Sequence, residues 1–129
     1  MTTTPDLYPP DYATTIGQVR LLIPDTEQLE NPTDLELEPQ YIFNDSQIQA
    51  FLSLYSDSVK RAAAQAKLVL ATSETLISKV IRTDDLQTDG AKLGAELRAQ
   101  AKELQEQAEK EELYDSYEDF EIVDFNRSI

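Results

Sequence analysis

The sequence predicts an all-α protein, a small bundle of about four helices with a long central helix, an acidic N-terminal loop and an extended C-terminal tail. Three observations support this prediction. Apolar residues recur every three or four positions through most of residues 13–113, which is the period of an amphipathic helix. Residues suited to helix N-caps precede several of these stretches. The length, 129 residues, is enough for one domain with one modest core.

The first predicted helix spans residues 13–23. Its apolar stripe consists of Ile16, Val19, Leu22 and Ile23. Either Thr14 or Thr15 is suited to cap its N-terminus, and Pro24 restricts the preceding backbone and ends it. Residues 24–40 contain three prolines and many carboxylates without a sustained helical stripe, so we expect a long surface loop there.

The second predicted helix follows a brief extended segment, residues 40–43. Asn44 and Gln47 stand three residues apart and predict a capping box, in which each side chain bonds the backbone N–H of the other residue. The apolar face of this helix follows at i, i+3, i+4 and i+7 and consists of Ile48, Phe51, Leu52 and Tyr55.

The third predicted helix carries the longest apolar stripe and is therefore the candidate for the long central helix. Ser56 or Asp57 is suited to cap it. Residues 62–66, AAAQA, are mostly alanine, and small side chains let a neighbouring helix approach closely. The pattern breaks at residues 83–89. The stripe consists of Val59, Ala62, Ala63, Ala66, Val69, Leu70, Ile77, Val80 and Ile81.

The fourth predicted helix runs from about Gly90 to Leu113 and is rich in strong helix formers. One face consists of Leu93, Leu97, Ala101, Leu104 and Ala108. This stripe is narrow for a helix of such length, and charged residues occupy most other positions. We therefore expect the helix to pack along one neighbour only, or to project from the body.

Charge divides the chain into three parts. The formal net charge of −14 separates into −7 for residues 1–40, −1 for residues 41–110 and −6 for residues 111–129. A balanced middle is typical of a folded helical body, whereas acidic flanks are typical of solvated or partner-bound arms. We therefore divide the chain into a short helix with an acidic loop (1–40), a helical body (41–112) and a docking tail (113–129).

Composition excludes several classes of function. The chain has no cysteine and no histidine, so it offers no disulfide, thiol nucleophile, histidine base or usual zinc site, and we expect no enzyme and no cofactor. Its acidic excess argues against a protein that grips DNA or a basic membrane-surface protein. No apolar run approaches a membrane span, and the start, MTTTPDLYPPDY, lacks the features of a signal peptide.

One motif resembles a calcium loop. In residues 84–96, DDLQTDGAKLGAE, Asp85, Asp89 and Glu96 take the first, fifth and twelfth positions of an EF-hand loop, with glycine at the sixth. Gln87 and Lys92 depart from that pattern, and no second loop is present to pair with it. We favour the alternative, a polar loop in which Thr88 or Asp89 caps the following helix, so no metal is expected.

Other charged residues carry weaker signals. The adjacent carboxylates Asp84 with Asp85, and Glu111 with Glu112, are poor evidence for acid–base chemistry because neighbouring side chains diverge. Six basic residues are interpreted as solvated helix faces or as partners for acidic neighbours: Arg20, Lys60, Arg61, Lys67, Lys79 and Arg82.

The tail, residues 113–129, contains apolar residues among many carboxylates. Candidate partner-binding residues are Tyr114, Tyr117, Phe120, Ile122, Val123 and Phe125. One interpretation is a docking peptide that adds a strand to a partner or fills its groove. The other is that the tail folds back on its own domain.

Two stretches, YATTIGQVRLLIPD near the start and residues 78–108, SKVIRTDDLQTDGAKLGAELRAQAKELQEQA, resemble head-to-tail adaptor (connector) proteins of long-tailed bacteriophages. With the FNDSQIQAFLSL segment, the resemblance spans the folded body. It implies a structural virion protein of the neck, made in the host cytoplasm, that forms a ring, commonly of twelve subunits, beneath the portal. Such a ring extends the DNA channel and presents a docking surface for the next neck or tail protein.

The charge is compatible with this role, because an acidic lumen repels DNA and lets it pass without specific binding. An alternative from another class is an acidic DNA mimic that inhibits a DNA-binding enzyme. That function needs carboxylates on one continuous face, whereas here they cluster at the ends of the chain.

Overall fold

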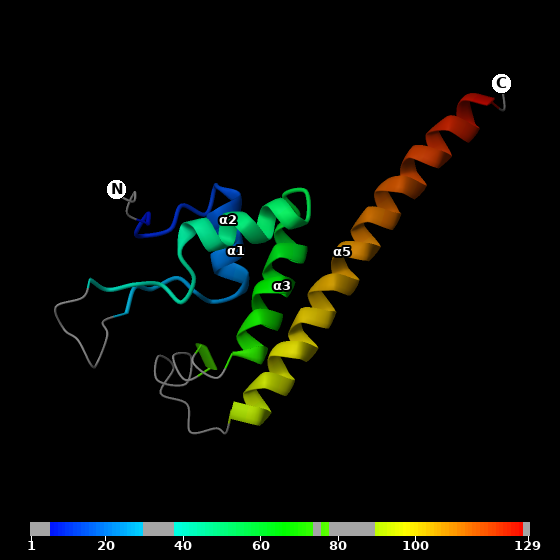
Figure 1. Cartoon of the computed structure of the whole chain (residues 1–129). Helices are drawn as coiled ribbons and strands as arrows, with labels where there is room; N and C mark the ends of the chain where they lie inside the picture. Colours follow the sequence, from blue (N-terminus) through cyan, green and yellow to red (C-terminus); the bar gives the residue numbers. More distant parts are fainter. Residues whose placement is uncertain (1–5, 30–37, 74–75, 78–89, 128–129) are drawn as a thin grey trace.

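The computed structural model of the protein describes residues 6–29, 38–73, 76–77 and 90–127 (Figure 1). Side chains within the last range are described as far as residue 116. The described residues form helices joined by loops and contain no strand. The predicted all-α class is therefore confirmed for this part of the chain.

Four helices are described in this part of the chain. They are α1 (Thr15–Leu22), α2 (Asp45–Leu54), α3 (Val59–Thr72) and α5 (Gly90–Arg127). Helices α1, α2 and α3 pack against one another, and α5 packs along α3 alone among them. Figure 1 shows α5 lying beside α3 and then continuing beyond the rest of the molecule.

Helix α1 begins and ends where the sequence predicts. The Thr14 hydroxyl accepts a hydrogen bond from the Gly17 N–H at 3.1 Å and so caps the N-terminus. The helix ends at Leu22, two residues before Pro24, and Val19 is fully buried on its inner face. The following loop meets the segment before α2 through an isolated antiparallel bridge between Leu29 and Gln40.

The capping box of α2 is confirmed. Asn44 Oδ1 accepts from the Gln47 N–H at 2.7 Å, and Gln47 Oε1 accepts from the Asn44 N–H at 2.8 Å. Two backbone donors at the helix start are thereby satisfied, which fixes the boundary. Ile48 and Leu52, four residues apart, are fully buried.

The N-cap of α3 is Ser58, so the prediction of Ser56 or Asp57 is wrong. A capping residue needs an extended backbone, and Ser58 has φ −72° and ψ 110°. Ser56 and Asp57 instead have positive φ values of 54° and 64° and make the tight connection from α2.

The sequence predicted one helix that is both long and central, but the structure divides these features between α3 and α5. Helix α3 contacts all three others and is central, but it ends at Thr72 instead of continuing to Ile81. Ser73 takes an extended conformation, and its hydroxyl accepts from the Leu76 N–H at 3.3 Å, so the chain starts a new turn there. Ile77 still reaches the core, while Val80 and Ile81 lie outside the described residues.

Helix α5 is the long helix of the fold. It starts at Gly90 as predicted, yet it continues past Leu113 to Arg127, so no break in the helix marks the start of the tail. The sequence has neither glycine nor proline after Gly94, and these are the residues that most readily end a helix.

Small side chains line the buried faces of α3, against which α5 and the other helices pack. Ala62, Ala63, Ala64 and Ala66 of α3 are all fully buried. The predicted stripe of α5 faces α3, with Leu93, Leu97, Ala101 and Ala108 buried and Leu104 half-buried. Alanine-rich surfaces allow such helices a close approach along their length.

Candidate protein-docking segment

Helix α5 leaves the body just after Ala108. Ala108 is the last buried residue among the described side chains of the helix, and every described side chain from Glu109 to Ser116 is exposed. Figure 1 shows the backbone of α5 continuing from this point, away from α1, α2 and α3. We name residues 109–127 the arm.

Two ion pairs join the arm to α3 at this exit. Lys60 Nζ bonds the Glu111 carboxylate. Arg61 pairs with Glu112 through two bonds of 2.9 Å, from Nε to Oε1 and from Nη2 to Oε2. Both cations come from the first turn of α3, so two adjacent residues of one helix contact two adjacent residues of the other.

The position of the two cations is electrostatically unusual. The first turn of a helix favours negative charge, yet α3 has no acidic residue there and carries Lys60 and Arg61 instead. The carboxylates of α5 supply the missing negative charge from another element. The hydrogen bond to Glu112 raises the pKa of Arg61, and the bond to Arg61 lowers the pKa of Glu112.

Apolar side chains stand exposed at the start of the arm. Leu113 is 70% exposed and Tyr114 is 64% exposed. Tyr114 also borders a shallow open depression with Lys110, Glu111 and Asp115. Of the predicted partner-binding residues, only Tyr114 has a described side chain. The others, all within the helical backbone of α5, are Tyr117, Phe120, Ile122, Val123 and Phe125.

A second cluster of charge lies inside the body, around Arg20. This side chain is 1% exposed. Its Nη1 donates to Asp25 Oδ2 at 3.1 Å and to the Phe43 carbonyl at 2.9 Å, and its Nη2 donates to Asp45 Oδ1 at 2.7 Å. The Tyr41 ring covers the guanidinium at 3.5 Å. Arg20 thus joins α1 to the segment that leads into α2.

Asp25 completes this cluster and is itself buried. Its carboxylate accepts from the Ile42 and Phe43 N–H groups at 2.9 and 2.8 Å. Burial raises the pKa of Asp25, although these two bonds and the charge of Arg20 oppose the change. Among the described residues, no buried side-chain polar atom lacks a partner. The cluster is therefore satisfied internally, as expected of a structural network.

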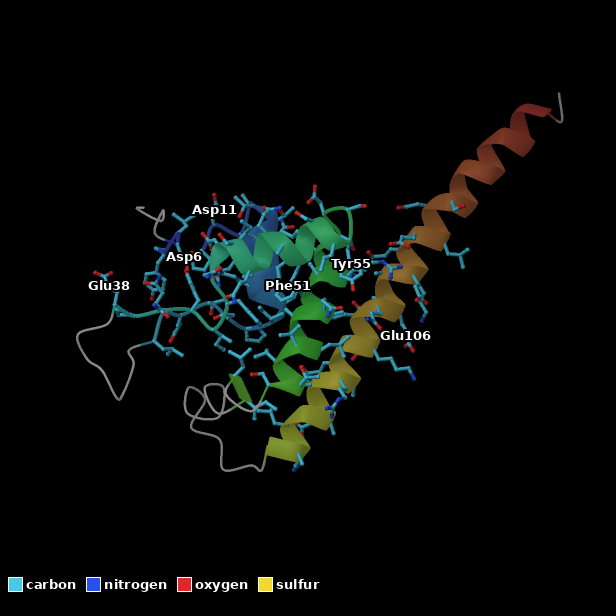
Figure 2. The ribbon with its side chains drawn as sticks, viewed as in Figure 1. Asp6, Asp11, Glu38, Phe51, Tyr55 and Glu106 are labelled. Atoms are coloured by element: carbon cyan, nitrogen blue, oxygen red, sulfur yellow. The ribbon has the colours of Figure 1, made fainter. Side chains whose placement is uncertain are left out.

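The N-terminal segment is held by the same cluster. Asp6 Oδ1 accepts from the Asp45 N–H at 2.9 Å, and Asp45 Oδ2 accepts from the Leu7 N–H at 3.1 Å. The Tyr41 hydroxyl donates to the Leu7 carbonyl at 2.6 Å. Figure 2 shows Asp6 close to the start of α2.

The six basic residues that were predicted to be solvated or paired have different environments in the structure. Lys60 and Arg61 pair with acidic neighbours, as predicted. Arg20 also pairs with acidic neighbours, Asp25 and Asp45, although it is buried instead of solvated. Lys67 is only 7% exposed and bonds the uncharged Gln100, so the prediction is wrong for this residue. Lys79 and Arg82 lie outside the described residues.

Lys67 lies between α3 and α5. Its Nζ donates to Gln100 Oε1 at 2.6 Å. Burial lowers the pKa of Lys67, because removing the ammonium from water disfavours its charged form. This burial was hard to predict, because only its position on the alanine-rich face of α3 distinguishes Lys67 from the surface lysines.

The remaining candidate sites, the calcium-loop motif and the adjacent carboxylates, are described only in part. Asp85 and Asp89 of the calcium-loop motif lie outside the described residues, as do Asp84 and Thr88, while Glu96 is exposed on α5. The described residues contain no cluster of three or more potential metal ligands. Glu111 and Glu112 bind separate cations instead of forming a carboxylate pair. No helix in the described ranges is long and apolar enough to cross a membrane.

Comparison with known proteins gives no match: no family model fits the chain, and no curated protein or solved structure is significantly similar to it.

Proposed function

We propose that this protein is a head-to-tail adaptor of a long-tailed bacteriophage. In this role it is a structural virion protein that forms a ring beneath the portal, extends the DNA channel and docks the next neck or tail protein. Its site of action is the virion neck, after synthesis in the host cytoplasm. The sequence resemblance suggests the role, and the arm of α5 is the structural feature that best supports it.

The supporting observation is that α5 serves two purposes along its length. Residues 90–108 pack on α3 through a buried apolar face, whereas the described side chains from Glu109 onward are exposed. A helix that continues beyond its own core presents a surface for another protein. Leu113 and Tyr114 supply apolar area on that surface, and the carboxylates around them favour a partner with basic residues.

Charge gives the proposal a second line of support. Twelve copies of a −14 chain would carry a formal charge of −168, so carboxylates that face a ring lumen would repel the DNA backbone. DNA would then pass through the ring without being held. A ring with a basic lumen and its carboxylates on the outer wall would contradict this part of the proposal.

The decisive experiment measures attachment to portal-bearing capsids that lack the adaptor. The full chain should bind them and form a ring visible by negative-stain electron microscopy. A chain without residues 114–129 keeps both ion pairs at the exit and should bind far less. The variant Glu103→Gln with Glu106→Gln, which alters exposed residues outside the arm, is the matched control and should bind normally.

Three outcomes are distinguishable. Failure of the full chain to bind would contradict the adaptor function itself. Normal binding of the truncated chain would contradict the role of the arm but leave the adaptor function intact. A compact monomer or dimer that competes with DNA for a DNA-binding enzyme would favour the DNA-mimic alternative. A monomer in solution alone decides nothing, since the ring can require the portal to form.

A further inference from the structure

The exit of the arm has the features of an ionic clamp. We propose that the pairs Lys60–Glu111 and Arg61–Glu112 hold the first turns of the arm helical and against α3, and that screening or neutralising these pairs releases them. Among the described side chains of α5, Ala108 is the last that is buried, and the four charged side chains of the two ion pairs join the arm to α3 beyond it. The clamp is a property of the chain alone and does not depend on the proposed function.

The need for a clamp follows from the charges within the arm. Glu111 and Asp115 stand four residues apart on α5, and Glu112 stands three residues from both Glu109 and Asp115. Like charges at these spacings face each other on a helix and destabilise it. Within residues 109–116 the sequence offers Lys110 as the single cation. The two cations of α3 therefore supply the countercharge that this stretch lacks.

The geometry makes the clamp specific. The Arg61 guanidinium meets the Glu112 carboxylate with two parallel bonds of 2.9 Å, an arrangement that fixes orientation as well as distance. Lys60 adds a second bond one residue earlier on both helices. Two adjacent pairs define the rotation of α5 relative to α3 just beyond Ala108.

The same pairs are open to solvent, which makes them sensitive to ionic strength. The side chains of Glu111 and Glu112 are 62% and 60% exposed, and those of Lys60 and Arg61 are 31% and 25% exposed. Screening acts strongly on charges in contact with water, and the Debye length falls from roughly 10 Å at 0.1 M salt to about 3 Å at 1 M. Salt should therefore open the clamp while the buried contacts of residues 93–108 persist.

Hydrogen exchange on the full chain, read by mass spectrometry, tests this proposal. The variant Glu111→Gln with Glu112→Gln should lower the protection of amides 111–116 by about threefold to tenfold at low salt. The matched control, Glu103→Gln with Glu106→Gln, removes the same charge from exposed positions of α5 and should leave that protection unchanged. Amides 62–70 of α3 should stay protected in every variant, which shows that the body remains folded.

A charge exchange makes the test decisive. Arg61→Glu alone should lower the protection of the arm, whereas Arg61→Glu combined with Glu112→Arg should restore it. At 1 M NaCl the difference between the natural chain and the Glu111→Gln/Glu112→Gln variant should vanish. Equal protection in that variant and its control at low salt, or failure of the exchanged pair to restore protection, would overturn the proposal.

Discussion

The guanidinium carbon of Arg20 lies 3.5 Å from the centroid of the Tyr41 ring, while the edge of the same group bonds Asp25 and Asp45. One buried cation is thus covered on a face by an aromatic ring and held at its edge by two carboxylates. Both kinds of contact gain strength where water is excluded. Arg20 therefore links α1, the loop after it, and the start of α2 in one network.

We predict that Arg20→Met lowers the free energy of unfolding by about 3–5 kcal/mol, because it leaves the buried Asp25 carboxylate without its cation. Arg20→Lys should be nearly as damaging, since an ammonium cannot reproduce the fork that reaches both carboxylates. Urea unfolding followed by circular dichroism measures both changes. Lys102→Met, at an exposed position of α5, is the control and should stay within about 0.5 kcal/mol. A loss below about 1 kcal/mol for Arg20→Met would show that the network is not needed for stability.

The Arg20 network could not be predicted from the sequence, whereas the helix caps could. The caps of α1 and α2 were predictable because each depends on residues three positions apart. Arg20 instead meets partners as far away as Asp45, and those contacts exist only after the loop has folded. A buried arginine and a solvated one have the same appearance in a helical pattern. Nothing local distinguishes them.

The predicted ends of α3 and α5 were wrong for a different reason. In the sequence, the apolar stripe of α3 continues to Ile81. In the structure, the Ser73 hydroxyl accepts a hydrogen bond from the Leu76 N–H and the helix is interrupted there, and the spacing of apolar residues does not reveal such a bond. For α5, the aromatic and acidic residues after Leu113 suggested a separate tail. No residue there forces an end, so the helix continues. The sequence predicted acidic partners for Lys60 and Arg61 but not which ones, because each ion pair joins residues 51 positions apart.

Gly17 provides a test of close packing at the N-terminus. A Cβ atom at this position would lie 1.9 Å from the Asp11 carbonyl oxygen, so the segment before α1 leaves no room for one. Gly17→Ala should force that segment away and destabilise the fold by roughly 1–3 kcal/mol. Gly94→Ala is the matched control in another helix, because its Cβ would meet the Ala71 carbonyl oxygen at an ordinary 3.5 Å.

The two alanine variants should therefore move thermal stability in opposite directions. Alanine favours a helix over glycine by about 0.5–1 kcal/mol, so Gly94→Ala should raise the melting temperature while Gly17→Ala lowers it. Differential scanning calorimetry on both variants measures this. An equal or higher melting temperature for Gly17→Ala would show that residues 11 and 12 do not pack against α1 in solution.

Lys67 should make stability depend on alkaline pH. Burial lowers the pKa of Lys67 in the folded state. At pH values between this folded-state pKa and the pKa in the unfolded chain, the unfolded chain therefore binds more protons than the folded one. Stability contributed by this residue then rises with pH through that interval. Lys67→Met should remove this rise and should stabilise the protein at pH 7 by about 1 kcal/mol, because a thioether replaces a poorly solvated charge.

The measurement for Lys67 is a difference between two proteins. Unfolding free energies of the natural chain and Lys67→Met, taken from pH 7 to pH 10.5, should converge as the pH rises. Subtraction removes the titration of the tyrosines and other lysines, which both proteins share. A constant difference across this range would mean that the Lys67 ammonium is solvated in the folded state. Lys102→Met again serves as the control and should show no such convergence.

Two truncations separate the contribution of the arm from that of the clamp. A chain that ends at Glu112 keeps both ion pairs and every residue of α5 that is buried among the described side chains, so its free energy of unfolding should stay within about 0.5 kcal/mol of the full chain. A chain that ends at Ala108 also loses the two carboxylates and leaves Lys60 and Arg61 in the first turn of α3 without countercharge. It should be measurably less stable than the longer truncation at low salt, and 1 M NaCl should remove that difference. If the chain ending at Glu112 lost as much stability as the one ending at Ala108, residues beyond the clamp would have to contact the body, and the arm could not be a free docking surface.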